Sequence, residues 1–246
     1  RIFKQKLPSG FFNGMIHPLI PYGIRGAIWY QGEANVDRAK SYRDLLCIMI
    51  GDCRKYWDQG DFTFLVVGLA NYLARAEQPG DSDWARLREA QFGVQNAITN
   101  AGFANTIDLG EEKNVHYKNK QDVGLRLALV ALARTYGQKL EYSGPVFKSM
   151  EKTKEGLKIN FDHAAGGLVT SDGGSPKGFA VAGEDKNWHW AKAGITNDSV
   201  ILTCDSVKDP MAARYAWADN PEVNLYNREK LPAVPFRTDS WPREKE

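Results

Sequence analysis

The sequence predicts a mixed α/β protein, with a helix-covered parallel sheet in its first part and a β-rich second part. Up to about residue 143, strand-like apolar runs alternate with helical patterns, which is typical of a parallel sheet. From about Gly144, short strand-like runs are separated by Gly, Asp, Ser and Pro, which favours an antiparallel sandwich. The 246 residues accommodate two such parts, and the expected domains are 1–143 and 144–246.

The α/β part opens with a Gly- and Pro-rich stretch over residues 1–23, which predicts a loop with at most a short helix. An apolar run at about 25–30 predicts the first strand. Between Asp37, a good helix-capping residue, and about Trp57, apolar residues recur at three- and four-residue spacing, which predicts a helix that packs on a sheet. Residues 62–69 are almost continuously apolar, as expected for a parallel strand covered on both faces.

Two more helices and one strand complete this part. A helix is expected from about 82 to 98, a third strand over 103–109, and a third helix from about 120 to 136. Gln91 lies on the apolar stripe of its helix, where it is either a hydrogen-bonded core amide or a support for an active site. Three strands are too few for a complete doubly wound sheet, so we expect the rest of the sheet to come from an upstream segment.

The composition narrows the classes of partner. A formal net charge of +2, with 43% hydrophobic and 25% charged residues, is that of a globular protein and gives no argument for nucleic acid or an acidic membrane. No apolar stretch approaches the roughly 18 residues that a membrane-spanning helix needs. The three cysteines form no disulfide framework, and no spacing of zinc ligands occurs. We therefore expect no metal, no cofactor, no nucleic-acid partner and no membrane partner.

A polar cluster follows the first expected strand. Gln31, Gly32, Glu33 and Asn35 come directly after the apolar run. Ligands of open α/β sheets bind beyond the carboxyl ends of the strands, so these residues are candidates for binding or catalysis. The alternative is a polar turn that hydrogen-bonds its own backbone.

Residues 29–35, Trp-Tyr-Gln-Gly-Glu-Ala-Asn, closely resemble the central block of the sialate O-acetylesterase family, a branch of the SGNH (GDSL-like) hydrolases. The chain carries further blocks similar to those of the family and in the same order, at residues 13–22, 107–110, 115–128, 178–185, 214–217 and 235–239. The resemblance implies a partial SGNH-hydrolase (flavodoxin-like) three-layer sandwich, followed by the β-rich C-terminal module. It also implies an esterase that removes acetyl groups from sugar hydroxyls, in a secreted, periplasmic or lysosomal location.

Ester hydrolysis by a serine enzyme needs a hydroxyl nucleophile, a histidine that takes and returns its proton, and donors to the developing oxyanion. His116 is the best placed of the four histidines, because it lies in a polar loop between an expected strand and an expected helix. We expect His17, His163 and His189 to be structural or surface residues. The resemblance implies that His116 is the general base for the serine and then the general acid for the leaving sugar hydroxyl.

The carboxylate that orients His116 has two main candidates, because Glu111 and Glu112 are nearer in the sequence but are expected to be exposed. Related enzymes carry an Asp-x-x-His block, but here Lys113 stands three residues before His116. Asp108 can serve only if the loop folds back. The resemblance favours Glu33 slightly, because related carbohydrate esterases use the Glu of this block. Tyr117 stands where the family usually has Pro, which leaves the path of the loop open.

Oxyanion donors and a nucleophile complete the expected mechanism. Gln31 is the candidate oxyanion-hole residue, and Gly32 and Asn35 are candidates for further contacts to oxyanion or substrate. The serine of the family lies in an early Gly-Gln-Ser-Asn-like block, which does not occur in this sequence. We therefore expect the C-terminal portion of an esterase that acts on an O-acetylated sugar, with the serine on an upstream segment or subunit. Other serines have unsuitable contexts, among them Ser9, Ser171 and Ser175.

Other functions stay open. The same fold can serve an acetylxylan or other polysaccharide deacetylase, and a chain that lacks the serine can be a non-catalytic carbohydrate-binding protein. Arg214 and Arg237 are expected to tie the β-rich module to the α/β domain through carboxylates. Four tryptophans can stack on sugars or, as we favour, pack in the core and interfaces of the module: Trp188, Trp190, Trp217 and Trp241.

Overall fold

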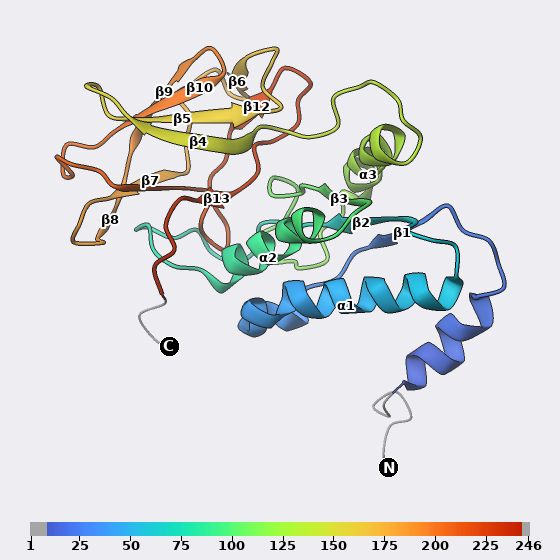
Figure 1. Cartoon of the computed structure of the whole chain (residues 1–246). Coiled ribbons are helices and arrows are strands. Elements are labelled where there is room, and N and C mark those ends of the chain that lie inside the picture. The colour runs from blue at the N-terminus through green and yellow to red at the C-terminus, as the bar shows by residue number, and fades with distance from the viewer. Residues whose placement is uncertain (1–8, 243–246) are drawn as a thin grey trace.

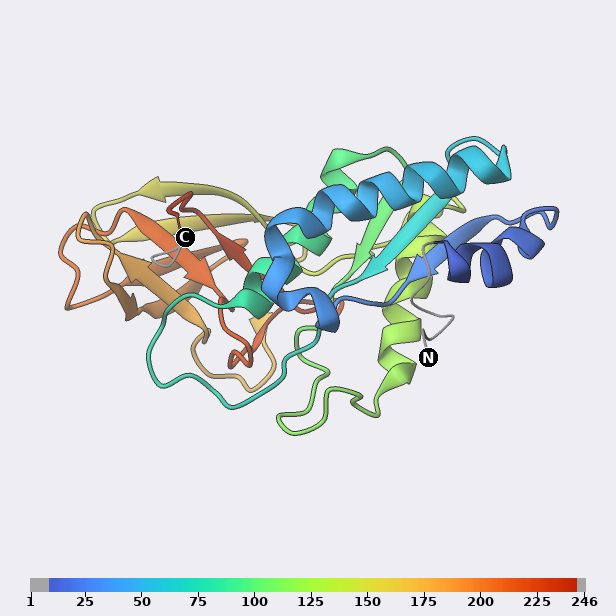
Figure 2. The same cartoon turned by 90° about the horizontal axis from the view of Figure 1, so that it is seen from below.

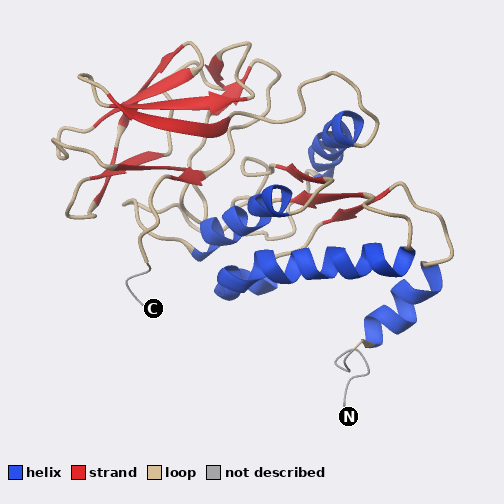
Figure 3. Ribbon diagram, in the orientation of Figure 1, coloured by secondary structure: helices blue, strands red, loops and turns tan. Residues whose placement is uncertain are grey.

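The computed structural model describes residues 9–242 of the chain. Figure 1 shows a layered α/β part beside a β-rich part, which contains β4 to β13. Figure 3 shows the long helices gathered in the α/β part, while the second part consists of strands and loops. The mixed α/β character and the β-rich second part agree with the sequence. The domain boundary near residue 144 stays a prediction.

The sheet of the α/β part has three parallel strands in the order β1-β2-β3. Its strands are β1 (Gly26–Trp29), β2 (Thr63–Val67) and β3 (Ala101–Ala104). The register sets Trp29 beside Val66 and Val66 beside Phe103, so the three strands end at nearly one level. The loops that leave them therefore share one edge of the sheet, where ligands of such folds bind.

Helices cover both faces of this sheet (Figures 1 and 2). On one face lie α1 (Ala39–Trp57) and α2 (Asp83–Ala97), and on the other lies α3 (Lys120–Arg134). Leu46 of α1 and Leu87 of α2 belong to one buried cluster with the side chains of β2. The α/β part therefore has three layers.

Element boundaries differ from the prediction in two places that matter for the site. The polar cluster after β1 is not a loop but largely a 3₁₀ helix, η4 (Glu33–Arg38), so α1 begins after it and not at Asp37. The third strand ends at Ala104, because the chain then turns and the Leu109 nitrogen donates to the Thr106 carbonyl oxygen. Of the expected loop over residues 1–23, residues 1–8 lie outside the described part of the chain, and the remainder contains two short helices, η2 (Phe12–Ile16) and η3 (His17–Leu19).

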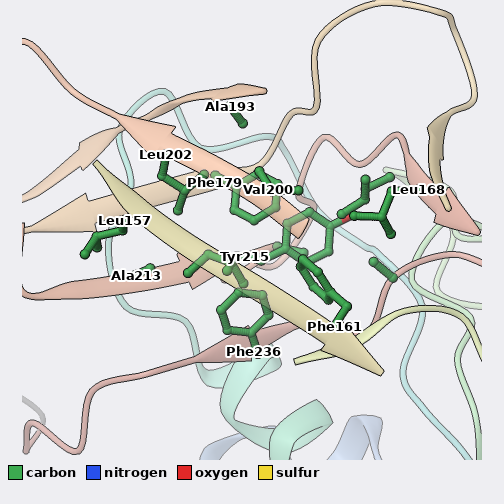
Figure 4. Close-up of a cluster of buried hydrophobic side chains, with 14 of the residues drawn as sticks. Leu157, Phe161, Leu168, Phe179, Ala193, Val200, Leu202, Ala213, Tyr215 and Phe236 are labelled. Carbon is green, nitrogen blue, oxygen red and sulfur yellow. The ribbon is translucent and has the colours of Figure 1, made fainter. Parts of the chain in front are cut away.

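The β-rich part is an antiparallel sandwich. One sheet has the order β4-β5-β10-β9, the other has the order β13-β11-β7-β8, and β12 pairs with β6. Figure 4 shows Phe161 and Val200 of the first sheet facing Phe179 and Tyr215 of the second in one buried cluster. The strands are β4 (Val146–Lys152), β5 (Leu157–Asp162), β6 (Leu168–Thr170), β7 (Phe179–Ala182), β8 (Trp188–Trp190), β9 (Lys192–Thr196), β10 (Ser199–Thr203), β11 (Ala212–Tyr215), β12 (Leu225–Asn227) and β13 (Phe236–Arg237).

Arg88 of α2 joins the two parts through backbone carbonyl groups. Its side chain is buried, and burial lowers the pKa of its guanidinium to about 9, which leaves it charged at neutral pH. Charge-assisted hydrogen bonds of this kind are stronger than neutral ones. The four acceptors, at 2.7 to 3.0 Å, are the carbonyl oxygens of Leu69, Ala70, Ala218 and Asp219.

The two arginines predicted to tie the parts together behave differently. Arg237 donates to both carboxylate oxygens of Glu89 on α2, at 2.9 and 3.0 Å, so that prediction is confirmed. For Arg214 the prediction is wrong, because its carboxylate partner is Asp239 of the β-rich part itself. Arg214 reaches the α/β part through the carbonyl oxygen of Gly80 instead, at 3.0 Å.

Three of the four tryptophans of the β-rich part make packing contacts, whereas Trp190 is 42% exposed and donates to the carbonyl oxygen of Glu77 at 3.0 Å. Trp217 is buried and donates to Asp81 at 3.1 Å, and the Arg214 guanidinium lies 4.0 Å from the ring centre of Trp188. Trp188 in turn packs on Trp241, with ring centres 5.5 Å apart. These contacts support the packing interpretation. No helix in residues 9–242 is long and apolar enough to cross a membrane.

Candidate active site

Gln91 of α2 joins two loops at the carboxyl edge of the parallel sheet. Its side chain is fully buried, Nε2 donates to the Gln31 carbonyl oxygen at 2.9 Å, and Oε1 accepts from the Leu69 nitrogen at 2.9 Å. Gln31 lies in the loop after β1, and Leu69 lies in the loop after β2. Gln91 is thus a hydrogen-bonded core amide, and its two partners are in the loops that carry the candidate site.

Gly32 lies directly against this amide. A Cβ atom at position 32 would be 2.7 Å from Nε2 of Gln91 and 3.2 Å from methyl groups of Leu69 and Leu87. Each of these neighbours is itself buried, so none can move away freely. The Gln-Gly pair in the sequence therefore has a packing reason: only glycine lets the loop approach α2 so closely.

The side chain of Gln31 is held at both ends. Its Nε2 donates to Oδ1 of Asn35 at 2.8 Å, and its Oε1 accepts from the Tyr42 hydroxyl at 3.0 Å. The hydroxyl oxygen of Tyr42 also lies 2.9 Å from the Gln31 carbonyl oxygen, and it accepts a hydrogen bond from Nε1 of Trp29. Within residues 9–242, one N–H of Gln31 and the side-chain N–H groups of Asn35 have no acceptor, so they are available to a ligand.

Tyr42 is missing from the predicted site residues for a simple reason. It lies at an apolar position of the α1 stripe, so the sequence pattern indicates a core residue. The structure agrees that the ring is buried, but its hydroxyl reaches the loop after β1. The signal that could have found it is the phenol itself, since a buried tyrosine usually directs its hydroxyl to a partner.

Glu33 is the first residue of η4 and is half-buried. In the part of the chain that the structure describes, its carboxylate accepts no hydrogen bond. Burial is the main cause that raises the pKa of Tyr30, Tyr42 and Tyr117. The negative charge of Glu33 is a smaller cause of each increase. The carboxylate therefore lies within electrostatic reach of all three hydroxyls, and Tyr117 directly follows His116 in the chain.

The loop that carries His116 is held by its own side chains. Glu111 accepts from the Lys118 nitrogen at 2.9 Å and from the Asn114 amide at 3.2 Å, and these bonds lower the pKa of its carboxyl. The side-chain oxygen of Asn114 in turn accepts a hydrogen bond from the backbone nitrogen of His116 at 3.0 Å. The ring of His116 is exposed and has no hydrogen-bond partner among the described residues. The sequence indicates only that Glu111 is an exposed carboxylate near His116, because a polar loop offers no periodic pattern from which these bonds could be predicted.

Asp108 has other partners than His116. Its carboxylate accepts from both terminal nitrogens of Arg126 on α3, at 2.6 and 2.8 Å. It also accepts from the hydroxyl of Tyr226 on β12 at 2.9 Å. Asp108 therefore links α3 to the β-rich part, and no described contact joins it to His116.

Lys120, the first residue of α3, brings the His116 loop to the loop after β1. Its Nζ donates to the hydroxyl of Tyr30 at 2.8 Å, and it lies 3.7 Å from the ring centre of Tyr117. The structure thus gathers the loop of Gln31, Gly32, Glu33 and Asn35 and the loop of His116 at one edge of the sheet. In residues 9–242, no serine is hydrogen-bonded to His116.

Comparison with known proteins adds an independent finding. A family described as carbohydrate esterase, sialic acid-specific acetylesterase, matches residues 15–133. Sialate O-acetylesterase of Mus musculus is 29% identical over 258 residues, which cover 93% of this chain and 47% of that protein. For the Homo sapiens protein the identity is 28%, and the coverage is 93% and 48%. The chain therefore spans about half the length of the curated relatives that it matches.

A solved structure is similar over almost the whole chain. It is described as a novel carbohydrate acetylesterase from Xanthomonas citri, and it is 42% identical with a TM-score of 0.90. The match covers 98% of this chain and 56% of that one. The matched family, the curated relatives and the solved structure are all described as sialate or carbohydrate acetylesterases, and this likeness agrees with the sequence blocks around Gln31 and His116.

Proposed function

We propose that this chain forms part of a carbohydrate O-acetylesterase, which removes acetyl groups from sugar hydroxyls by a Ser-His-acid mechanism. One observation carries the proposal: the Gln31–Glu33 loop and the His116 loop lie together at the carboxyl edge of a helix-covered parallel sheet. The likeness to a solved carbohydrate acetylesterase supports the same reaction. The three-layer α/β part supports an SGNH-type fold. The proposed compartment is secreted, periplasmic or lysosomal.

In the proposed mechanism, a serine hydroxyl attacks the acetyl carbonyl carbon while His116 takes the serine proton. The tetrahedral intermediate collapses, the sugar oxygen leaves with the proton from His116, and an acetyl-serine remains. Water, deprotonated by His116, then attacks the acetyl carbon, and the serine ester bond breaks as His116 returns the proton to the serine oxygen and acetate leaves. Glu33 stabilises the imidazolium form of His116, and N–H groups of Gln31 and Asn35 donate to the oxyanion.

We further propose that the serine comes from an upstream segment or subunit that docks along β1. β1 pairs with β2 and forms one edge of the described sheet. Ile28, in this edge strand, is 67% exposed, and Tyr136 at the end of α3 is 61% exposed. Between β1 and the end of α3 lies a cavity of about 370 Å³. A further parallel strand would pair with the open N–H and C=O groups of this edge, and the crossover segment that accompanies it would cover the exposed face of β1.

The first experiment is to label the purified full-length protein with a fluorophosphonate serine probe and to map the modified peptide. We expect an adduct on a peptide outside residues 1–246. An adduct on a serine within this chain would overturn the upstream assignment and keep the hydrolase. No adduct, with sugar affinity retained, would favour the non-catalytic carbohydrate-binding alternative.

A second experiment separates catalysis from binding. His116→Ala should lower turnover of an O-acetylated sugar by about 1,000-fold or more while sugar affinity stays. His189→Ala, in β8 of the second part, is the matched control and should leave turnover unchanged. Comparing kcat/KM on O-acetylated sialic acid and on acetylated xylo-oligosaccharides then distinguishes a sialate esterase from a polysaccharide deacetylase.

A further inference from the structure

Lys120 occupies a position that helix energetics does not explain. It is the first residue of α3, where the positive end of the helix dipole and the unpaired N–H groups disfavour a cation. The residues around it follow the usual rules: Asn119 caps the helix by accepting from the Asp122 nitrogen at 3.1 Å, and Asp122 supplies a negative charge in the first turn. The contacts that the structure shows for this lysine lie outside the helix.

The ammonium group has two aromatic partners on two different loops. Nζ donates to the Tyr30 hydroxyl at 2.8 Å and lies 3.7 Å from the ring centre of Tyr117, within cation–π range. Tyr30 directly precedes Gln31, and Tyr117 directly follows His116. One side chain thus contacts the chain neighbours of the two groups whose relative position the proposed chemistry requires.

Tyr117 is the part of the His116 loop that enters the core. Only 3% of its surface is exposed, and it packs in a buried cluster with Val67, Ala70 and Val123. Its buried hydroxyl makes no hydrogen bond of good geometry among the described residues, and the nearby hydroxyls of Tyr30 and Thr106 lower its pKa against the larger, opposite effect of burial. A buried hydroxyl without a well-formed hydrogen bond contributes little stability, so packing of the ring and its contact with Lys120 contribute to holding this position. Lys120 supplies the cation–π contact that the structure shows for this ring.

We propose that Lys120 is a positioning residue that clamps the His116 loop to the Gln31–Glu33 loop through Tyr117 and Tyr30. We name these three residues the Lys120 clamp. It rests on the proposed function, because its purpose is to fix His116 relative to Glu33. Burial raises the pKa of Tyr30, so the phenol stays neutral and accepts a hydrogen bond rather than forming an ion pair. Misplacing a catalytic group by about 1 Å can lower a rate by about 100-fold.

The test is a double-mutant cycle in the full-length esterase, with kcat and KM measured on an O-acetylated sugar. Lys120→Met should lower kcat by about 10- to 100-fold with KM within about threefold, since the clamp orients His116 and does not touch substrate. Tyr30→Phe should have a smaller effect, and the double variant should lose no more than Lys120→Met alone, because both changes open the same clamp. Lys120→Arg should restore most of the activity, since arginine keeps both kinds of contact.

Lys113→Met is the matched control. Lys113 is an exposed lysine of the same loop, without a described side-chain contact, and its replacement should change neither kcat nor KM. Unchanged kcat in Lys120→Met would overturn the clamp. So would losses in Lys120→Met and Tyr30→Phe that multiply in the double variant, because independent effects mean that the two residues do not act together.

Hydrogen exchange separates failure of the clamp from failure of the proposed function. In Lys120→Met, backbone amides of residues 30–35 and 110–118 should both exchange faster than in the wild-type protein. This readout does not depend on turnover, so it applies even if the wild-type protein proves inactive. Unchanged exchange in either loop would overturn the clamp, whatever the activity of the protein.

Discussion

Nε2 of Gln91 lies 2.9 Å from the carbonyl oxygen of Gln31 and thereby fixes the candidate oxyanion loop to helix α2. The other end of the same amide accepts from the Leu69 nitrogen, so one buried side chain sets the spacing between the loops after β1 and β2. The candidate site is therefore built on rigid elements, even though its own residues lie in a 3₁₀ helix and loops.

Replacing Gln91 by leucine should both destabilise the protein and weaken catalysis. Gln91→Leu leaves the Leu69 nitrogen buried without a partner and removes one of the two donors to the Gln31 carbonyl oxygen, which should lower the free energy of unfolding by about 1–3 kcal/mol. Urea unfolding measures this loss. Asn96→Leu, an exposed amide on the same helix, is the control and should change stability by less than about 0.5 kcal/mol. Equal effects of the two changes would contradict the role of Gln91.

Two glycines offer a matched pair. Gly32→Ala places a Cβ 2.7 Å from Nε2 of Gln91, so we expect a loss of about 1–3 kcal/mol and a shifted oxyanion loop. Gly51 lies within α1 with no atom within 4 Å of the added Cβ, and Gly51→Ala should stabilise by about 0.5–1 kcal/mol. Thermal unfolding should therefore show a lower melting temperature for Gly32→Ala and a higher one for Gly51→Ala than for wild type. A Gly32→Ala variant as stable as wild type would show that the loop can move away from Gln91.

The roles of Glu33 and Asp108 can be distinguished by whether a substitution changes kcat or the free energy of unfolding. Glu33→Gln should lower kcat by about 100-fold or more with little change in stability, because the carboxylate has no described hydrogen bond to lose. Asp108→Asn should lower the free energy of unfolding by about 1–3 kcal/mol, because it weakens the bonds to Arg126 and Tyr226. Steady-state kinetics and urea unfolding of both variants decide. The reverse pattern would make Asp108 the partner of His116.

The regular elements were predictable because they follow local patterns. The apolar run of β2 and the stripes of α1 and α2 repeat with the periods of strand and helix, and the sequence carries those periods directly. The sequence predicts that the third strand continues to residue 109, because apolar residues recur beyond Ala104, where β3 ends. Ile107 is apolar and buried, but it belongs to the core of the β-rich part rather than to β3.

The partners within the site were less predictable, because they depend on tertiary distance. Asp108 is near His116 in the sequence, yet its acceptor oxygens face Arg126 and Tyr226, which lie 18 and 118 residues away. Gln91 stands out in the sequence as a polar residue on an apolar stripe, and in the structure its side chain holds the loops after β1 and β2. Polar exceptions to a periodic pattern are thus more informative here than closeness in the chain.

Acid should remove the stabilisation that Asp172 provides in the β-rich part. Hydrogen bonds from the Asn224 amide, Lys177 and the Gly174 nitrogen lower the pKa of Asp172 from 3.8 to about 2. Because the folded-state value is the lower one, the contribution is complete above about pH 4 and is lost as the pH falls toward 2. Urea midpoints at pH 5 and pH 2.5 should therefore differ less in Asp172→Asn than in wild type.

The control for this acid dependence is Asp58→Asn. Asp58 is an exposed aspartate just after α1, and asparagine also tolerates its left-handed backbone conformation. We expect the acid dependence of Asp58→Asn to match that of wild type. Since Asp172 is at the surface, 1 M salt should reduce its contribution. An unchanged pH dependence in Asp172→Asn would mean that its hydrogen bonds do not favour the ionised carboxyl.

The open edge of β1 gives the sharpest test of how the esterase is assembled. Ile28→Lys introduces a charge at a side chain that is 67% exposed, so it should leave the stability of this chain alone within about 0.5 kcal/mol. If an upstream segment adds along β1, the same charge becomes buried at the new interface and should weaken association at least about 10-fold. Leu45→Lys, at an exposed apolar position of α1, is the control and should not affect association. Titration of the separately produced upstream segment measures both. Equal affinity of wild type and Ile28→Lys would move the docking site away from β1, because a strand that covers Ile28 cannot tolerate an unpaired lysine there.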